Sequence, residues 1–226
     1  MGGRNNIKTI AWVFLVMCLG SGCTKPALRV GRPIGSAAVI PFFQKTPPGE
    51  GGGLVEDPIS GRLLVAGQIV PNARRELTDL IYLKLADFPQ LDLVPLREVE
   101  GAVRTGEFEG DPIRSAQRIG EAFGVDGVLL GWVFRYEERI GSAIAVERPA
   151  SVSFAIHLVG VKEDRVLWRG FFQETQQPLS ENILKFTAFL RRRGRWLTAK
   201  DLASVGMDEV LVSFPASREG PEPEGE

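Results

Sequence analysis

Apolar and polar positions alternate with a period of two in the segments DGVLLGWVFRYEERI and SVSFAIHLVGV, which is typical of β-strands. The first segment places these residues on one side: Val128, Leu130, Trp132, Phe134 and Tyr136. The second does the same with Val152, Phe154, Ile156 and Leu158. RVLWRGFFQETQQ is a third such segment, and turns are expected at 141–149 and at Glu163-Asp164. Because the three segments follow one another, we predict an antiparallel meander.

A helical period governs other parts of the chain. IVPNARRELTDLIYLKLADF is amphipathic, with these apolar residues along one side: Ala73, Leu77, Leu80, Ile81 and Leu85. DPIRSAQRIGEAFG has Asp111 as N-cap, Pro112 at the first position and Gly124 as the stop. A short helix is predicted in LREVEGAVRTG, another over 180–192, and a last one opened by Thr198, whose spacing to Asp201 allows a capping box.

SAAVIPFF reads as a buried first strand and LDLVP as a short one. We therefore expect an α+β fold in a single domain, residues 34–214, with a mixed, largely antiparallel sheet of about five strands and helices packed against it. The glycine-rich segment 44–62 has no period and matches no phosphate-binding motif, so it is predicted to be a loop. Whether that loop is functional or merely flexible stays open.

The N-terminus has the three parts of an export signal. Arg4 and Lys8 precede an apolar run, residues 10–19, and small residues follow it. Ten helical residues span roughly 15 Å, about half of the ~30 Å hydrocarbon core of a bilayer. We therefore expect residues 1–22 to be a signal peptide. An ordinary secretory signal cut after a small residue is the alternative, and Cys23 would then be a plain thiol.

Leu19-Gly20-Ser21-Gly22-Cys23 resembles the lipobox of bacterial lipoproteins, with the aliphatic residue one place further from the cysteine than in the commonest form. The resemblance implies that Cys23 carries palmitate and other acyl chains, enough for stable membrane attachment. Residues 23–33 would be the lipidated cysteine followed by a tether of ten residues, and 215–226 would be a disordered acidic tail. Thr24 in place of an inner-membrane retention signal implies the periplasmic face of the outer membrane.

Without the signal, Cys18 is lost and no free thiol remains. The 27 basic residues lose Arg4 and Lys8, which leaves a formal charge of −3 against 28 acidic residues, so no nucleic-acid partner is expected. His157, the single histidine, is predicted to lie on an exposed sheet surface. We expect no metal, no cofactor and no catalytic residues, although Glu107 and Glu109 could share a face.

RRRGRW is the one basic cluster, and it comprises Arg191, Arg192, Arg193, Arg195 and Trp196. Cations at a helix C-terminus oppose the negative end of the dipole, which is the simpler interpretation. The other interpretation is a contact with anionic lipid headgroups, polysaccharide or an acidic partner. Both interpretations stay open from the sequence.

Several motifs resemble the periplasmic domain shared by curli-secretion pore lipoproteins of CsgG type, lipoprotein activators of penicillin-binding proteins and lipoproteins of exopolysaccharide export. They are AAVIPF, LKLADF before LDLVPLREVE, AQRIGEAFGVDGVLLGWV and RVLWRG. The resemblance implies structural roles for Asp126 and Gly131 at the helix-to-strand junction and for Trp168 in the core.

The resemblance also implies a lipid-anchored, non-enzymatic envelope protein that binds a protein partner and forms a homo-oligomer. Two alternatives are a subunit of an outer-membrane secretion channel and a hydrolase of envelope polymers. The segment between Arg135 and Ser153 carries several charges and Pro149, so we expect it not to span a membrane.

Overall fold

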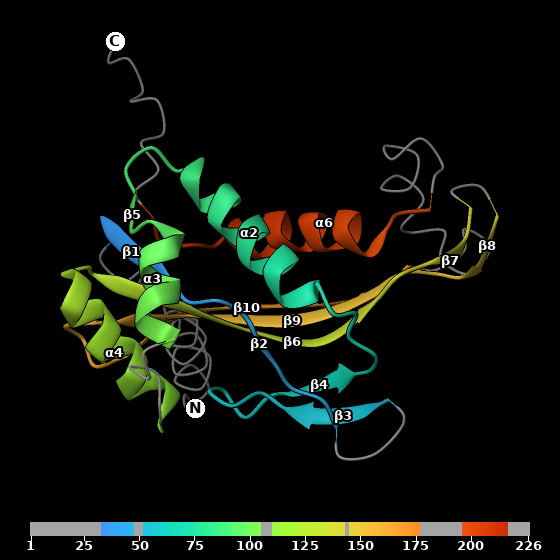
Figure 1. The fold of residues 1–226 in the computed structure, drawn as a ribbon, viewed down its shortest axis with the longest axis horizontal. Helices are drawn as coiled ribbons and strands as arrows, with labels where there is room; N and C mark the ends of the chain where they lie inside the picture. The colour runs from blue at the N-terminus through green and yellow to red at the C-terminus, as the bar shows by residue number, and fades with distance from the viewer. Residues whose placement is uncertain (1–32, 48–51, 105–109, 143–144, 177–195, 217–226) are drawn as a thin grey trace, which may run out of the picture. The chain divides into compact units, whose positions relative to one another are not determined.

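The structure is a computed structural model that describes residues 33–47, 52–104, 110–142, 145–176 and 196–216. The chain divides into two units, Met1–Val30 and Gly31–Glu226, and every described residue belongs to the second unit. That unit is α+β, with helices packed on a mixed six-stranded sheet (Figure 1), which confirms the predicted fold class.

The sheet contains the predicted antiparallel meander, formed by β6 (Gly127–Glu137), β9 (Ser151–Gly160) and β10 (Arg165–Thr175). Parallel strands complete it: β1 (Ser36–Val39) and then β2 (Phe43–Gln44) pair with β6, and β5 (Asp92–Leu93) pairs with β1. The strand order is β10-β9-β6-β1-β5, so β6 lies at the centre. Every residue of β9 is buried, which requires a cover on both faces of the sheet.

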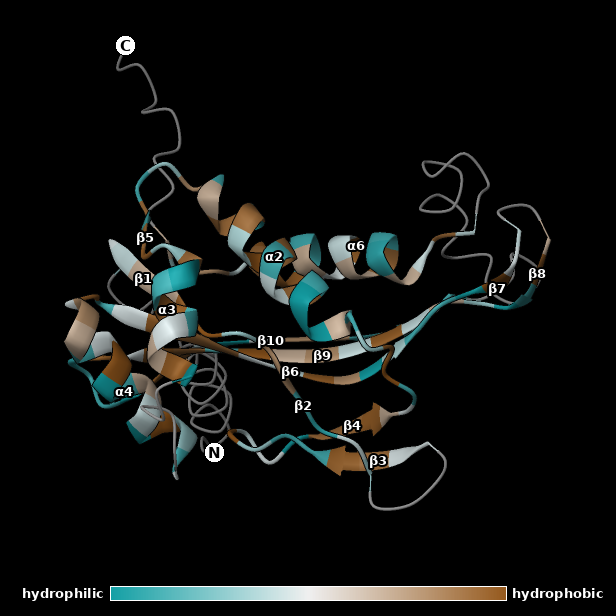
Figure 2. Cartoon of the chain, viewed as in Figure 1, coloured by the Kyte–Doolittle hydropathy of each residue, from teal (hydrophilic) through white to brown (hydrophobic). Residues whose placement is uncertain are grey.

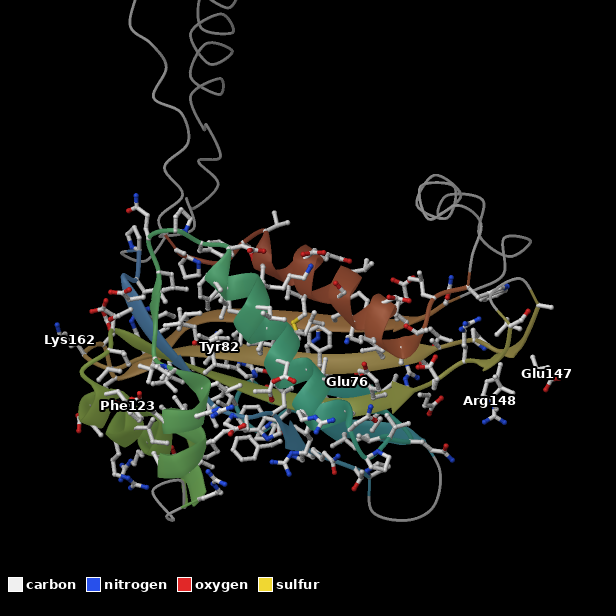
Figure 3. All side chains as sticks on the ribbon, turned by 45° about the horizontal axis from the view of Figure 1, so that its top comes forward. Glu76, Tyr82, Phe123, Glu147, Arg148 and Lys162 are labelled. Atoms are coloured by element: carbon white, nitrogen blue, oxygen red, sulfur yellow. The ribbon has the colours of Figure 1, made fainter. Side chains whose placement is uncertain are left out.

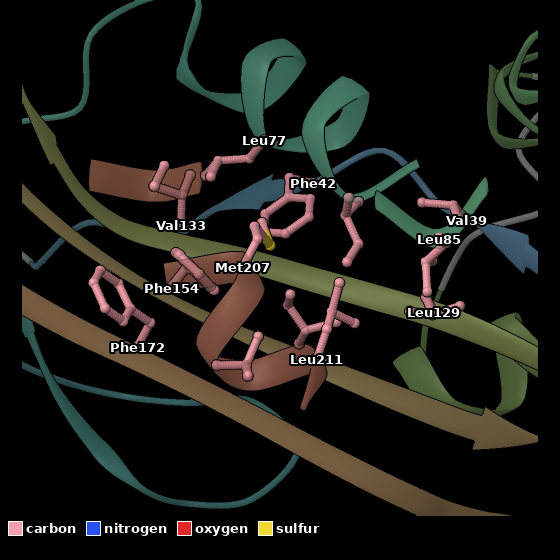
Figure 4. Close-up of a cluster of buried hydrophobic side chains, with 14 of the residues drawn as sticks. Val39, Phe42, Leu77, Leu85, Leu129, Val133, Phe154, Phe172, Met207 and Leu211 are labelled. Carbon is pink, nitrogen blue, oxygen red and sulfur yellow. The ribbon is translucent and has the colours of Figure 1, made fainter. Parts of the chain in front are cut away.

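Two helices cover one face, α2 (Ala73–Ala86) and α6 (Ala199–Leu211). Apolar side chains gather between them and the sheet, as the close-up in Figure 4 shows, and Figure 2 colours the residues of the ribbon by hydropathy. Its labelled members are Val39, Phe42, Leu77, Leu85, Leu129, Val133, Phe154, Phe172, Met207 and Leu211. The predicted apolar side of α2 is buried here apart from the half-buried Leu80, and α6 begins with the predicted capping box of Thr198 and Asp201.

Three elements form the cover of the opposite face. They are α3 (Leu96–Ala102), α4 (Pro112–Phe123) and a hairpin of β3 (Gly53–Glu56) and β4 (Leu63–Ala66). Asp111 caps α4 and Gly124 ends it in the left-handed conformation, as the sequence predicts. The prediction of a loop over 44–62 is wrong for residues 53–56, which form β3, while β4 follows the predicted loop. Val55, Leu64 and Ala66 of the hairpin are buried in a second core. The two four-residue strands are held by packing on the sheet.

A β-bulge in β6 changes which face its last residues occupy. The pairing of β6 with β9 shifts between Val133 and Arg135. Val128, Leu130, Trp132 and Phe134 face the second core as predicted, but Tyr136 faces α2 instead. The prediction for Tyr136 is wrong because one extra residue in a strand reverses the alternation. The Tyr136 hydroxyl donates to the Glu76 carboxylate at 2.6 Å, and burial together with that carboxylate raises the pKa of Tyr136.

The two ends of the long strands differ. Ile34 pairs with Ala216 near Gly127, so the chain enters and leaves the described domain at the same end of the sheet. At the other end, the predicted turn at 141–149 contains a second hairpin of β7 (Ile140–Gly141) and β8 (Val146–Arg148). Figure 3 labels Glu147 and Arg148 at that end and Lys162 at the first. The predicted helix over 180–192 lies outside the described residues.

We expect Gly131→Ala to lower the free energy of unfolding by about 1–3 kcal/mol, because overpacking a tight core forces neighbours to shift. A Cβ at Gly131 would lie 2.5 Å from the Phe42 ring. Gly101→Ala is the matched control, since no atom lies within 4 Å of its added Cβ and alanine favours the helix by roughly 0.5–1 kcal/mol. Urea unfolding of both variants measures the difference, and equal stabilities would contradict the assigned packing.

Candidate functional site

The predicted contact cluster is described only in part. Cys23, Arg191, Arg192, Arg193 and Arg195 lie outside the described residues. Trp196 is half-buried, and the next residue, Leu197, donates its N–H to the Gln176 side chain at 2.8 Å. Gln176 pairs with Ala150 beyond the end of β10, so Trp196 lies at the β7–β8 end of the sheet. Strands of this length extend about 35 Å, which separates Trp196 from the end of the sheet where Ile34 lies.

Asp126 joins the end of α4 to the first strand. Its Oδ2 accepts hydrogen bonds from the Gly35 N–H (3.1 Å), the Ser36 N–H (3.1 Å) and the Ser36 hydroxyl (3.0 Å), while the Ser36 hydroxyl oxygen accepts from the Asp126 N–H. Burial alone would raise the pKa of Asp126, but these donors outweigh it and hold the pKa below its usual range. The side chain therefore ties the junction between α4 and β6 to the start of β1.

Gly131 and Trp168 occupy different parts of the first core. The Phe42 ring fills the space over Gly131. Trp168 is half-buried at the margin of this core, edge-on to the Phe214 ring with 5.2 Å between centroids. Its indole N–H donates to the Ser213 hydroxyl at 3.0 Å, so it ties β10 to the segment that follows α6.

His157 is the largest departure from the sequence analysis. Its side chain is fully buried, and its Nε2 lies 3.0 Å from Oδ1 of Asp57, which is 1% exposed. The prediction of an exposed histidine is wrong because the β3–β4 hairpin covers this face of β9. The Trp132 and Phe171 rings approach His157 edge-on at 5.9 and 5.7 Å between centroids, and Arg62 lies over Phe171. A buried carboxylate and imidazole therefore face each other in an aromatic enclosure.

Asp57 belongs to the turn between β3 and β4. Its Oδ2 accepts from the Ser60 N–H at 2.7 Å and the Ser60 hydroxyl at 2.5 Å, and its backbone pairs with Arg62 and Gly61. Burial by itself raises the pKa of Asp57, yet the hydrogen bonds from His157 and Ser60 outweigh this and lower it. One carboxylate thus shapes the turn and fastens it to the centre of the sheet.

The Asp57–His157 pair resembles two thirds of a catalytic triad, but its surroundings differ from an active site. The carboxylate holds Nε2, which leaves Nδ1 of His157 to act, and Nδ1 is buried with no hydrogen-bond partner in the described part of the chain. A general base must reach the proton that it abstracts. The geometry therefore fits a structural latch. Sequence analysis missed Asp57, although Asp57-Pro58-Ile59-Ser60-Gly61 has the composition of a turn.

The other carboxylates that the sequence brings forward are engaged separately. Glu137 Oε1 accepts from the Gln68 N–H at 3.0 Å, whereas Glu138 accepts from the Ala199 N–H at the start of α6. Glu107 and Glu109 lie outside the described residues. Within the described ranges, no group of three or more histidine, cysteine or acidic side chains could hold a metal ion. No helix among those same residues has the length and apolar character needed to cross a membrane.

Comparison with known proteins gives only distant similarities. No protein-family model matches the sequence, and no curated protein matches it. Among solved structures, the chain is similar to the PelC dodecamer from Paraburkholderia phytofirmans (14% identity, 85% of this chain and 94% of that chain, TM-score 0.47). It is also similar to lipoprotein GNA1162 from Neisseria meningitidis (15%, 71% and 94%, TM-score 0.42) and to the LpoB C-terminal domain from Escherichia coli (15%, 73% and 94%, TM-score 0.39). At these values the similarities carry no conclusion about activity or partners.

We expect His157→Leu to lower the free energy of unfolding by about 3–5 kcal/mol at pH 7, because it leaves the Asp57 carboxylate buried without its partner. The double variant Asp57→Asn/His157→Leu removes that stranded charge and should recover part of the loss. Thermal unfolding of the three proteins measures both effects.

The same pair predicts a pH dependence. The pKa of Asp57 is lowered in the folded state, so its stabilising contribution is fully present above the usual carboxyl value of 3.8 and is lost as pH falls through the lowered pKa. The difference in stability between wild type and Asp57→Asn should therefore shrink below pH 3.8. A difference that stays constant from pH 5 to strongly acid pH would contradict an ionised Asp57.

Proposed function

We propose that this chain is a lipid-anchored periplasmic protein of the outer membrane that binds a protein partner without catalysing a reaction, as an accessory in export or cell-envelope biogenesis. The observation that carries the proposal is the sequence Leu19-Gly20-Ser21-Gly22-Cys23 at the end of an apolar run. Acylation of Cys23 would hold the domain at the membrane through a tether of ten residues, which reaches at most about 35 Å.

The described part of the chain supports a binding role over a catalytic one. The acid–base groups that sequence analysis raised there have structural partners: His157 holds Asp57, Glu138 caps α6 and Glu137 binds the backbone of Gln68. A catalytic site needs groups that reach a substrate. The proposal therefore assigns the function to surfaces of the domain.

The test of the anchor uses the full chain expressed in a Gram-negative host with labelled palmitate. Wild type should incorporate label and sediment with the outer membrane, and Cys23→Ala should lose both properties because it lacks the acceptor thiol. Cys18→Ala is the matched control, since it removes the other cysteine from within the signal and should leave labelling unchanged.

The side of the outer membrane that the domain faces is measured in the same cells by protease digestion. After the outer membrane is permeabilised, added protease should digest the domain of the wild-type protein, as expected for a domain that faces the periplasm. Labelling that survives Cys23→Ala, or a domain that is digested in intact cells, would refute the proposed anchor or its orientation.

A further inference from the structure

β10 has a long edge that no other strand covers within the described residues. It ends the strand order at one side, and β5 at the other side is only two residues long. The central strand β6 differs, because β1, β2 and a bridge from Ile69 to Tyr136 follow one another along its outer edge. An uncovered strand edge presents unpaired N–H and C=O groups to any chain that can pair with it.

The alternation of hydrogen-bonded pairs between β9 and β10 shows which backbone N–H and C=O groups of β10 point away from β9. Gln176 donates its N–H to the Ala150 carbonyl, so this pair belongs to the hydrogen-bonded positions of the β9–β10 ladder. Such positions recur at every second residue in antiparallel pairing. The outward groups therefore belong to Arg169, Phe171, Gln173 and Thr175, and no backbone hydrogen bond reaches them from the described residues.

This stretch lacks the features that usually blunt an edge. The pairing irregularity of β10 lies before it, between Val166 and Trp168. From Arg169 to Thr175 the strand contains no proline and no lysine. The Phe171 side chain is half-buried, and its ring contacts His157 on the face of the sheet. Natural edge strands are commonly protected by bulges, prolines or lysines. The last seven residues of β10 are therefore competent for strand addition.

We infer that β10 pairs antiparallel with β10 of a second copy of this chain. The charges of the strand favour a second copy in this orientation: Arg165 and Arg169 lie in its first part and Glu174 near its end. An in-register parallel copy would place each of these charges beside its like, whereas an antiparallel copy separates them.

A two-fold axis at Phe171 gives a pairing with no like charges opposite one another. Phe171 then faces its own copy and Arg169 faces Gln173 of the second copy, so outward N–H and C=O groups meet their counterparts. A two-fold interface closes on itself, which predicts a dimer rather than a ring at this edge. The inference depends on the sheet alone and does not require the proposed lipid anchor.

The test compares Gln173→Pro with Gln173→Ala in the full chain, extracted from membranes in mild detergent. Proline removes the outward N–H of residue 173, whereas alanine keeps it. Both variants lose the hydrogen bond that the Gln173 side chain accepts from the Val65 N–H, so alanine controls for that loss. Native mass should show dimers for wild type and Gln173→Ala and a shift to monomer for Gln173→Pro, with unchanged circular dichroism.

Amide hydrogen exchange on wild type provides a second measurement if Gln173→Pro fails to fold. The N–H groups of residues 169, 171, 173 and 175 should exchange slowly at concentrations where the dimer forms and much faster after dilution. A wild-type monomer, a Gln173→Pro variant that stays dimeric, or a loss of dimer in Gln173→Ala would each overturn the inference. Protection that persists in a monomer would show that another segment of the same chain covers the edge. A failure here would leave the Cys23 labelling result untouched.

Discussion

The structure depends on one constraint: its central strands are apolar on both faces, so the sheet is stable only when both faces are covered. Every residue of β9 and all but two of β6 are buried. Helices α2 and α6 supply one cover from long amphipathic segments. The other cover is assembled from α3, α4 and the short β3–β4 hairpin, none of which could bury its apolar side chains alone. The second core therefore relies on tertiary contacts to a greater degree than the first.

Two carboxylates fasten the pieces that the chain brings together from distant positions. Asp57 links the hairpin turn to His157, a residue 100 positions away, and Asp126 links the start of β6 to β1 across 90 positions. In both cases hydrogen-bond donors outweigh burial and keep the pKa below the ordinary value. Each carboxylate is therefore ionised at neutral pH and satisfied by several donors. For Asp57, which is fully buried, this is the condition under which a buried charge is tolerated, whereas Asp126 is half-buried. The same arrangement explains why the single histidine is unsuited to catalysis.

Features governed by local periodicity could be predicted from the sequence. The meander, α2 and α4 follow from apolar spacing, and the ends of α4 and the start of α6 follow from capping residues. The hairpin could not be predicted, because its strands are only four residues long and the first of them lies in a glycine-rich segment without a visible period. That error produced the second one, since a face without a cover makes His157 look exposed. The predicted side of Tyr136 is wrong for a different reason. A bulge reverses the alternation of faces along β6, and no residue type in that strand marks the position of the bulge. Asp57 shows the limit most clearly, because its partner is defined only by the folded sheet.

The open edge of β10 and the proposed anchor strengthen each other physically. Seven residues of added strand make few hydrogen bonds, and each contributes only about 0.5–1.5 kcal/mol net, against an association entropy of several kcal/mol. Such pairing therefore depends on protein concentration when the molecules diffuse freely in solution. The proposed tethers of about 35 Å on a shared membrane would confine the domains to a thin layer, which would raise their effective concentration in the way that linked binding modules do. Anchoring would therefore raise the fraction of paired domains above the fraction that the same protein reaches in detergent.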